Sequence, residues 1–149
     1  MGDQLLDAFT QKLDALGYVK GKGIILSRII VPPETKAIEF VITTLLSEID
    51  ILVIWGTIGA AAAKRLNSSI PTVFLSVGAP VDIGLVQSLS HPGGNMTGVS
   101  FEAASDTYAK RLQMLKEVVP SLKTVAVLAA QGDPNVAFAM NSLETLPLH

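Results

Sequence analysis

The chain has 149 residues and a formal net charge of -2 at pH 7, with 49% hydrophobic residues, 16% charged residues and no cysteine. The small charged fraction argues against intrinsic disorder, and the lack of a basic excess argues against nucleic acid as a partner. Without cysteine, and with His91 and His149 as its two histidines, the sequence predicts no disulfide, no cysteine nucleophile and no metal site.

Apolar residues recur at helical spacing in several segments. In the first, Leu5, Phe9, Leu13 and Leu16 share one helical face, and Gly17 follows where a helix often ends in a left-handed residue. Further helices are predicted over 34–49, 60–66, 81–89, 108–119 and, weakly, 135–146.

Short apolar runs between these helices predict strands, over 24–30, 50–55, 72–77, 96–100 and 124–129. The run 50–55 is continuously apolar, which predicts burial on both faces, and the helical stripe of 108–119 predicts core packing. Strands that alternate with helices form right-handed βαβ units. We therefore expect an α/β fold, an open parallel sheet with helices on both faces.

Ligands of open parallel sheets bind at the carboxyl ends of the strands, which directs attention to the loops Gly56–Gly59, Ser76–Pro80 and Gly98–Glu102. Gly56–Gly59 joins a strand to a helix and would offer backbone N–H groups and the Thr57 hydroxyl to a carboxylate or another anion. A purely structural turn and a nucleotide contact are the other interpretations, although no P-loop lysine follows. Ser76–Pro80 offers a hydroxyl at the same position, or simply a proline-initiated helix start.

Other polar residues suggest little chemistry. His91 has no Ser or Cys partner at a known spacing and is expected in a turn, and Thr97-Gly98 is expected to form a hinge or a strand-end turn. No nucleophile, base and orienting group come together, so we expect no catalysis. The carboxylates outside the loops are expected to be solvated; they include Asp3, Asp7, Asp14, Glu48 and Asp50.

Five segments carry a more specific pattern: FTQKLDALGYVKGK (9–22), WGTIGAAAAK (55–64), SIPTVFLSVGAPV (69–81), GLVQSLSHPGGNMTG (84–98) and KRLQMLKEVVP (110–120). In this order they resemble the ABC-transporter substrate-binding proteins of the tryptophan/tyrosine-type uptake family, over roughly residues 8–130. The resemblance implies a non-catalytic periplasmic-binding-protein-like molecule, periplasmic or anchored outside the cytoplasmic membrane. Its two α/β lobes would close on a small ligand, without a cofactor, and serve an ABC permease.

The resemblance also implies a domain division and a ligand site. Residues 1–99 would be a first lobe without its opening strand, and 100–149 the crossover and an incomplete start of the second lobe, so we expect a truncated chain. The family usually has Asp where Ala79 stands, so a polar contact there would be lost or would come from Ser76. An amino acid or a similar carboxylated ligand would contact Gly56, Thr57, Ile58, Ser76, Val77, Gly78, Ala79, Pro80, Ser100 and Phe101.

Three expectations follow from this interpretation. One lobe alone should bind ligand weakly, because closure of a second lobe supplies much of the contact. The unpaired sheet edges and apolar surface of a fragment favour a homodimer. The alternative function is a small α/β nucleotide- or phosphate-binding enzyme domain that uses the Gly56–Gly59 turn.

Overall fold

The chain divides into two compact units, residues 1–30 and 31–149, and the computed structural model describes residues 2–145. In the first unit, helix α1 spans Gly2–Ala15. It ends as predicted: Gly17 has a φ of 92°, and the N–H groups of Tyr18 and Gly17 donate to the carbonyls of Leu13 and Asp14. This double hydrogen bond is a Schellman motif, which satisfies the last carbonyls of the helix.

The strand predicted over 24–30 is mostly wrong. The first unit contains only two short paired strands, β1 (Val19–Lys20) and β2 (Gly23–Ile24). Residues 25–30 are assigned to no strand, and Ile25 and Ile30 are largely exposed. A β-branched run becomes a strand only where a neighbouring strand accepts and donates its hydrogen bonds, and the described residues supply no such neighbour here.

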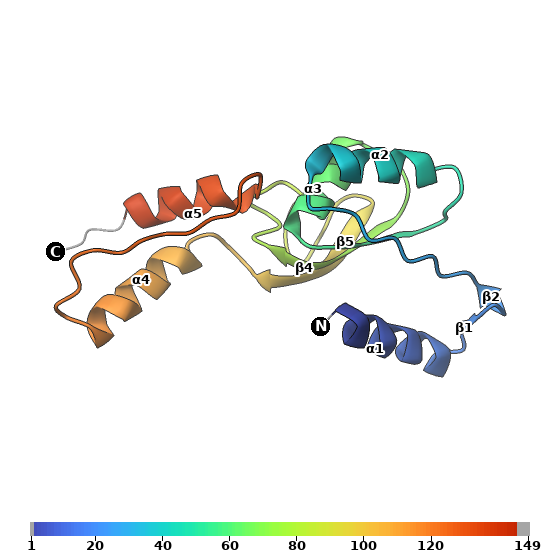
Figure 1. The fold of residues 1–149 in the computed structure, drawn as a ribbon, viewed down its shortest axis with the longest axis horizontal. Coiled ribbons are helices and arrows are strands. Elements are labelled where there is room, and N and C mark those ends of the chain that lie inside the picture. Colours follow the sequence, from blue (N-terminus) through green and yellow to red (C-terminus); the bar gives the residue numbers. More distant parts are fainter. Residues whose placement is uncertain (1, 146–149) are drawn as a thin grey trace. The chain divides into compact units, whose positions relative to one another are not determined.

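The second unit is built on a parallel three-stranded sheet of order β3-β4-β5. Its strands are β3 (Leu52–Trp55), β4 (Thr72–Gly78) and β5 (Met96–Glu102), and two helices, α2 (Thr35–Leu45) and α3 (Thr57–Arg65), pack on it (Figure 1). This arrangement confirms the predicted parallel α/β sheet.

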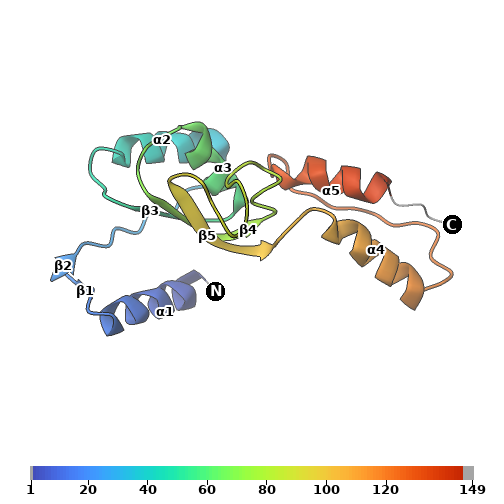
Figure 2. The ribbon, with the colours of Figure 1, turned by 180° about the vertical axis from the view of Figure 1, so that it is seen from behind.

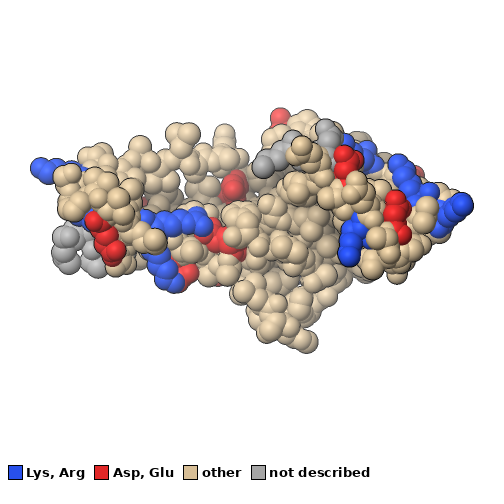
Figure 3. Space-filling view, turned by 90° about the horizontal axis from the view of Figure 1, so that it is seen from below, with Lys and Arg blue, Asp and Glu red and all other residues tan. Residues whose placement is uncertain are grey.

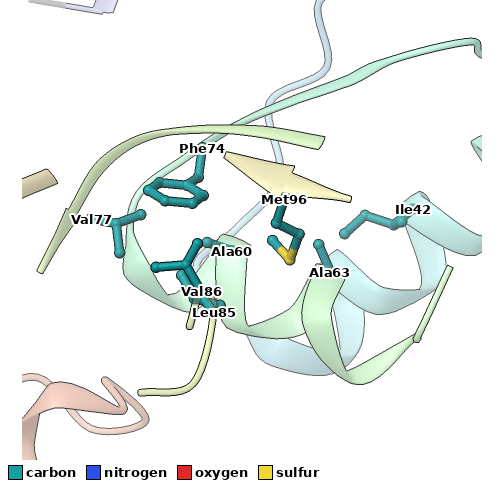
Figure 4. Packing of buried hydrophobic residues seen from close by; sticks show 8 residues of the cluster. All are labelled: Ile42, Ala60, Ala63, Phe74, Val77, Leu85, Val86 and Met96. Atoms are coloured by element: carbon teal, nitrogen blue, oxygen red, sulfur yellow. The ribbon is translucent and has the colours of Figure 1, made fainter. Parts of the chain in front are cut away.

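The core lies between α2, α3 and one face of the sheet (Figure 4). Phe74 of β4 and Met96 of β5 point from the strands toward the small side chains of α3, and Ile42 closes the cluster from α2. Alanines at the buried positions of α3 allow the helix to approach the sheet closely.

The other face of the sheet is open within this unit. Trp55, Leu75 and Val99 are register partners on the three strands and therefore share that face. Val53, Trp55, Val99 and Phe101 are all exposed, Trp55 by 54% and Phe101 by 60%. The prediction that the run 50–55 is buried on both faces is therefore wrong, because this sheet face has no covering layer among the described residues of the unit.

The predicted helix over 81–89 is also wrong. Residues 81–89 form a series of turns, with isolated hydrogen bonds such as Gly84 N–H to the Val81 carbonyl and Leu85 N–H to the Pro80 carbonyl. Gly84 has a φ of 72°, which is incompatible with a continuous right-handed helix. Leu85 and Val86 nevertheless reach the core from these turns.

The chain beyond β5 forms two helices, α4 (Thr107–Val118) and α5 (Asn135–Glu144), joined by residues that run back from the end of α4 to the start of α5 (Figure 2). Both helices were predicted. The strand predicted over 124–129 is wrong, because these residues are extended without a strand partner and Leu128 is fully exposed. The predicted core stripe of 108–119 is wrong too, since no residue of α4 is buried.

Candidate functional site

The carboxyl end of β4 has an irregular backbone. Ser76 and Ala79 adopt left-handed φ values of 56° and 40°, and the register with β5 shifts between Leu75 and Gly78. Non-glycine residues adopt such angles at a cost and only where the surroundings hold them. A bulge of this kind redirects side chains at a strand end. Because β4 continues to Gly78, only Ala79 and Pro80 of the predicted Ser76–Pro80 loop lie outside the strand.

Gly56 begins α3 with a φ of 85° and a ψ of 159°, a conformation that strongly favours glycine. Its own N–H donates to the Leu75 carbonyl at 2.9 Å, which fixes the start of the helix beside the end of β4. The first N–H groups of α3 lack acceptors within the helix, so the positive end of the helix dipole lies at this edge of the sheet.

Thr57, Gly78 and Asn135 form a buried polar cluster at the same edge. The Thr57 Oγ1 accepts a hydrogen bond from the Gly78 N–H at 3.2 Å and another from the Asn135 Nδ2 at 3.3 Å. A Cβ added at Gly78 would lie 2.6 Å from that Nδ2 and 3.0 Å from Cζ of Phe101. Because Gly78 has no side chain, the Asn135 amide and the Phe101 ring can both lie close to its backbone.

Asn135 was not among the residues predicted for the site. Asp133 Oδ1 accepts a hydrogen bond from the Asn135 N–H at 2.9 Å, so the carboxylate caps the start of α5 with Pro134 at the next position. The Asp-Pro pair therefore signals a helix start, but the sequence alone does not show that this helix meets α3 and β4.

A shallow hollow of about 310 Å³ lies on the open face of the sheet, beside the polar cluster. Its walls are mostly apolar side chains of the three strands, with hydroxyl groups from β4 and β5. The lining residues are Trp55, Leu75, Ser76, Val99, Ser100 and Phe101. The Phe101 ring thus contacts both the hollow and the Gly78–Asn135 pair.

Glu102 ends β5 with a buried carboxylate that the sequence analysis placed in a loop but gave no role. Its Oε1 lies 2.8 Å from Arg111 Nη2 of α4, whose side chain is 58% exposed, and the Arg111 guanidinium stacks 5.4 Å above the ring centre of Tyr108. Burial, followed by a hydrogen-bonding contact with Glu102 and by its charge, raises the pKa of Tyr108. Acidic and basic side chains lie close together at the α4 end of the molecule (Figure 3).

The structure places half of the predicted site residues in the polar cluster or in the lining of the hollow. Thr57 and Gly78 belong to the polar cluster, and Ser76, Ser100 and Phe101 line the hollow. The remaining predicted residues differ in place: Gly56 and Ile58 lie at the start of α3, Ala79 and Pro80 are buried in the loop, and Val77 packs in the core. Thr97 and Gly98 lie inside β5, so neither the predicted hinge nor the predicted strand-end turn is found there.

Among residues 2–145, no group of three or more His, Asp or Glu side chains is arranged to hold a metal ion. The same residues contain no helix with the length and hydropathy needed to cross a membrane. His91 is exposed in an irregular segment between β4 and β5, next to a bend at Leu89 and Ser90.

Comparison with known proteins identifies the family. A model of the family described as ABC transporter substrate binding protein matches residues 6–147, nearly the whole chain. This chain belongs to that family. A curated relative, a tyrosine-binding protein of Clostridioides difficile, is 28% identical over 142 residues, which cover 95% of this chain and 40% of the relative.

Solved structures agree with the family assignment. A conserved domain protein from Vibrio cholerae matches with a TM-score of 0.76 and 28% identity, over 91% of this chain and 45% of that one. A ligand-free, open substrate binding protein with adhesive properties from Clostridium difficile matches with a TM-score of 0.65 and 26% identity, over 95% and 48% of the two chains. An ABC domain from Streptococcus pneumonia in complex with L-Trp shares the fold, with a TM-score of 0.72 and 21% identity over 89% and 44%. The chain thus spans less than half the length of each of these matched proteins.

Proposed function

We propose that this chain acts in solute binding for an ABC importer and takes a small ligand with a carboxylate and an apolar part, such as an amino acid. The polar cluster of Thr57, Gly78 and Asn135, placed against the apolar hollow at the carboxyl ends of β3–β5, carries the proposal. The family and the tyrosine-binding relative support it.

The two parts of the site suit the two parts of such a ligand. The N-terminus of α3 carries a partial positive charge, and the Thr57 hydroxyl accepts two protein donors and keeps its own hydrogen for a ligand oxygen. These groups would hold a carboxylate. Trp55 and Phe101 offer aromatic surface to an apolar or aromatic side chain.

The remaining features of the proposal come from the family. We place residues 1–99 in a first lobe and 100–149 at the crossover and start of a second lobe, and we expect an ABC permease as partner and a location outside the cytoplasmic membrane. The role requires no catalysis and no cofactor. A homodimer stays a prediction, which light scattering tests: a mass equal to one chain would contradict it.

Saturation-transfer NMR on the full chain tests the ligand class. We expect signals from L-tyrosine and L-tryptophan, weak binding, and no competition from ATP. If ATP binds and no amino acid does, the proposal is wrong and the nucleotide-binding alternative replaces it.

Two matched variants test whether the ligand binds in the hollow. Phe101→Ala removes the ring between the hollow and the polar cluster and should weaken L-tyrosine binding by roughly three- to tenfold, the range for one aromatic pair. Phe40→Ala removes an exposed ring on α2 that does not line the hollow, and it should leave binding unchanged. Equal effects of the two variants would contradict the site.

A further inference from the structure

Residues 124–129, the connecting segment between α4 and α5, are extended like a strand but have no strand partner. Three of the six residues, Thr124, Val125 and Val127, are β-branched and favour a strand. Within the described part of the chain, no backbone–backbone hydrogen bond involves residues 123–129, and all of them are exposed. Both edges of the connecting segment are therefore open, and an open strand edge is a template for pairing with another chain.

The two ends of the connecting segment are fixed by hydrogen bonds. Before it, the Leu122 carbonyl accepts a hydrogen bond from the Lys116 Nζ of α4 at 2.7 Å, and the Leu122 N–H donates to the Val119 carbonyl at 3.0 Å. After it, the Asp133 N–H donates to the Ala130 carbonyl at 3.3 Å, in the turn that precedes α5. A segment that is already extended between fixed ends loses less conformational entropy on pairing than a free chain does.

The two sides of the connecting segment differ in exposure. Val125 and Val127 share one side, because side chains alternate along a strand, and they are 44% and 50% exposed. Leu128 lies on the other side and is fully exposed. One side is thus partly covered by the rest of the chain. A two-stranded sheet needs such a covered side to be stable in water.

The apolar surface of the α4–α5 region is large enough for a weak dimer. Its exposed apolar side chains include Met114, Val118, Val119, Val125, Val127 and Leu128. At the usual surface of apolar side chains, these residues expose roughly 200–450 Å² per copy. Because apolar atoms make up about 60% of an interface, two copies that cover most of this surface bury roughly 700–1,500 Å² in all. That range begins below the size of stable interfaces, so we expect reversible association.

Charge selects the direction of pairing. The connecting segment contains no charged residue, but Lys123 precedes it and Asp133 follows it. In an antiparallel pair, the Lys123 end of one copy lies at the Asp133 end of the other, whereas a parallel pair brings like charges together. An antiparallel pair also uses the same residues of both copies about a two-fold axis.

We propose that the connecting segment is a homodimer interface, at which residues 124–129 of two copies pair as antiparallel strands with Ala126 near the two-fold axis. Val125 of each copy then lies opposite Val127 of the other, and the partly covered sides of both segments face the same way. The occupant is a second copy of this chain. The interface contains no residue of the hollow or of the polar cluster, so it is independent of the proposed ligand site.

Sedimentation velocity on the unmodified chain tests the association. We expect the mass of one chain, 15.7 kDa, below about 10 μM and an approach to twice that mass by about 500 μM, because an interface of this size is weak. The mass of one chain at every concentration in this range would overturn the proposal. A mass that grows beyond two copies would also overturn it, because growth requires a contact without two-fold closure.

Two lysine substitutions locate the interface. Val127→Lys places a charge in the centre of the antiparallel pair, close to the same charge on the second copy, so the dissociation constant of the dimer should rise at least about tenfold. Ile25→Lys is the matched control, because Ile25 is 89% exposed in the other unpaired β-branched run of the chain. It should leave the dissociation constant unchanged. Equal effects of the two variants, or an effect of Ile25→Lys alone, would contradict the proposed interface.

Cysteine cross-linking tests the direction of pairing and does not depend on the folding of the lysine variants. The chain has no cysteine, so a single substitution gives one thiol per copy. Ala126→Cys should form a disulfide between copies, whereas Ala130→Cys should not, because antiparallel pairing separates the two Ala130 positions by about 27 Å. Equal cross-linking by the two variants, or none by Ala126→Cys, would overturn the antiparallel pair.

Discussion

Two regions of residues 31–149 differ in how they bury apolar side chains. In the sheet region, β3–β5 with α2 and α3, the core residues Phe74, Val77 and Leu85 are at most 2% exposed. In the α4–α5 region, α4 has no buried residue, Met114 is 64% exposed, and Leu128 is fully exposed. Both regions have helices with apolar residues at helical spacing. A helix therefore forms from its local pattern, whereas burial depends on a second surface that the pattern does not describe.

Replacing a leucine by alanine should change the stability of the two regions very differently, and this is the largest effect that we expect. Leu85→Ala removes a side chain from the core and leaves a cavity, so we expect the free energy of unfolding to fall by about 2–5 kcal/mol. Leu128→Ala should change it by less than about 0.5 kcal/mol. Urea denaturation followed by circular dichroism measures both. Similar losses for the two variants would mean that the α4–α5 region is packed after all.

A glycine pair tests how tightly the sheet region is packed. A Cβ at Gly98 would overlap the carbonyl oxygen and the ring of Phe74, whereas a Cβ at Gly94 meets no atom within 4 Å. Gly98→Ala should therefore destabilise the chain by about 1–3 kcal/mol, the usual range for overpacking, and Gly94→Ala should be close to neutral. Thermal unfolding compares the two. A neutral Gly98→Ala would contradict the close approach of β5 to β4.

Asn135 joins the two regions, because it stands on α5 and contacts Thr57 and Gly78. Asn135→Ala removes the hydrogen bond to Thr57 Oγ1 and should cost about 0.5–1.5 kcal/mol of unfolding free energy. Asn141→Ala changes an exposed asparagine on the same helix and serves as the control. Hydrogen exchange at the amides of α5 should accelerate in the first variant only. Unchanged exchange would show that α5 docks without this contact.

Substitution of Tyr108 should have the smallest effect on stability among these variants. Its raised pKa means that the folded chain favours the neutral phenol, so the associated stability is present below pH 10.0 and is lost as the pH rises through the raised value. Tyr108→Phe should make the alkaline decline in stability less steep, with Tyr18→Phe as the control. An absorbance titration in which Tyr108 ionises below its ordinary range would contradict the contact with Glu102.

The sequence predicts local features well and long-range ones less well. The Schellman end of α1 at Gly17 follows from a single glycine, because few other residues adopt that angle. The helix predicted over 60–66 begins earlier, at Thr57, so most of the predicted Gly56–Gly59 loop is helix. The runs 24–30 and 124–129 look like strands but have no strand partners among the described residues. The apparent helix over 81–89 fails at Gly84, whose positive φ is decided by the turn around it.

The same limit applies to the site. The rule that ligands bind at strand ends selects Thr57, Ser76 and Ser100, which were expected in loops. The structure places them at the start of α3 and near the ends of β4 and β5, at one edge of the sheet. It does not select Asn135, which is 78 residues from Thr57 in sequence and meets it only through the docking of α5. The sequence around Glu102 also gives no sign that its side chain is buried, because Glu residues are mostly exposed.

The most direct test of the account is an amide chemical-shift titration of the ¹⁵N-labelled chain with L-tyrosine. The account predicts saturable shifts at Thr57, Gly78, Asn135 and Ser100, together with the indole N–H of Trp55, and no comparable shifts in α2. Shifts confined to other residues, or none up to the solubility of the amino acid, would contradict a ligand site at the carboxyl ends of β3–β5.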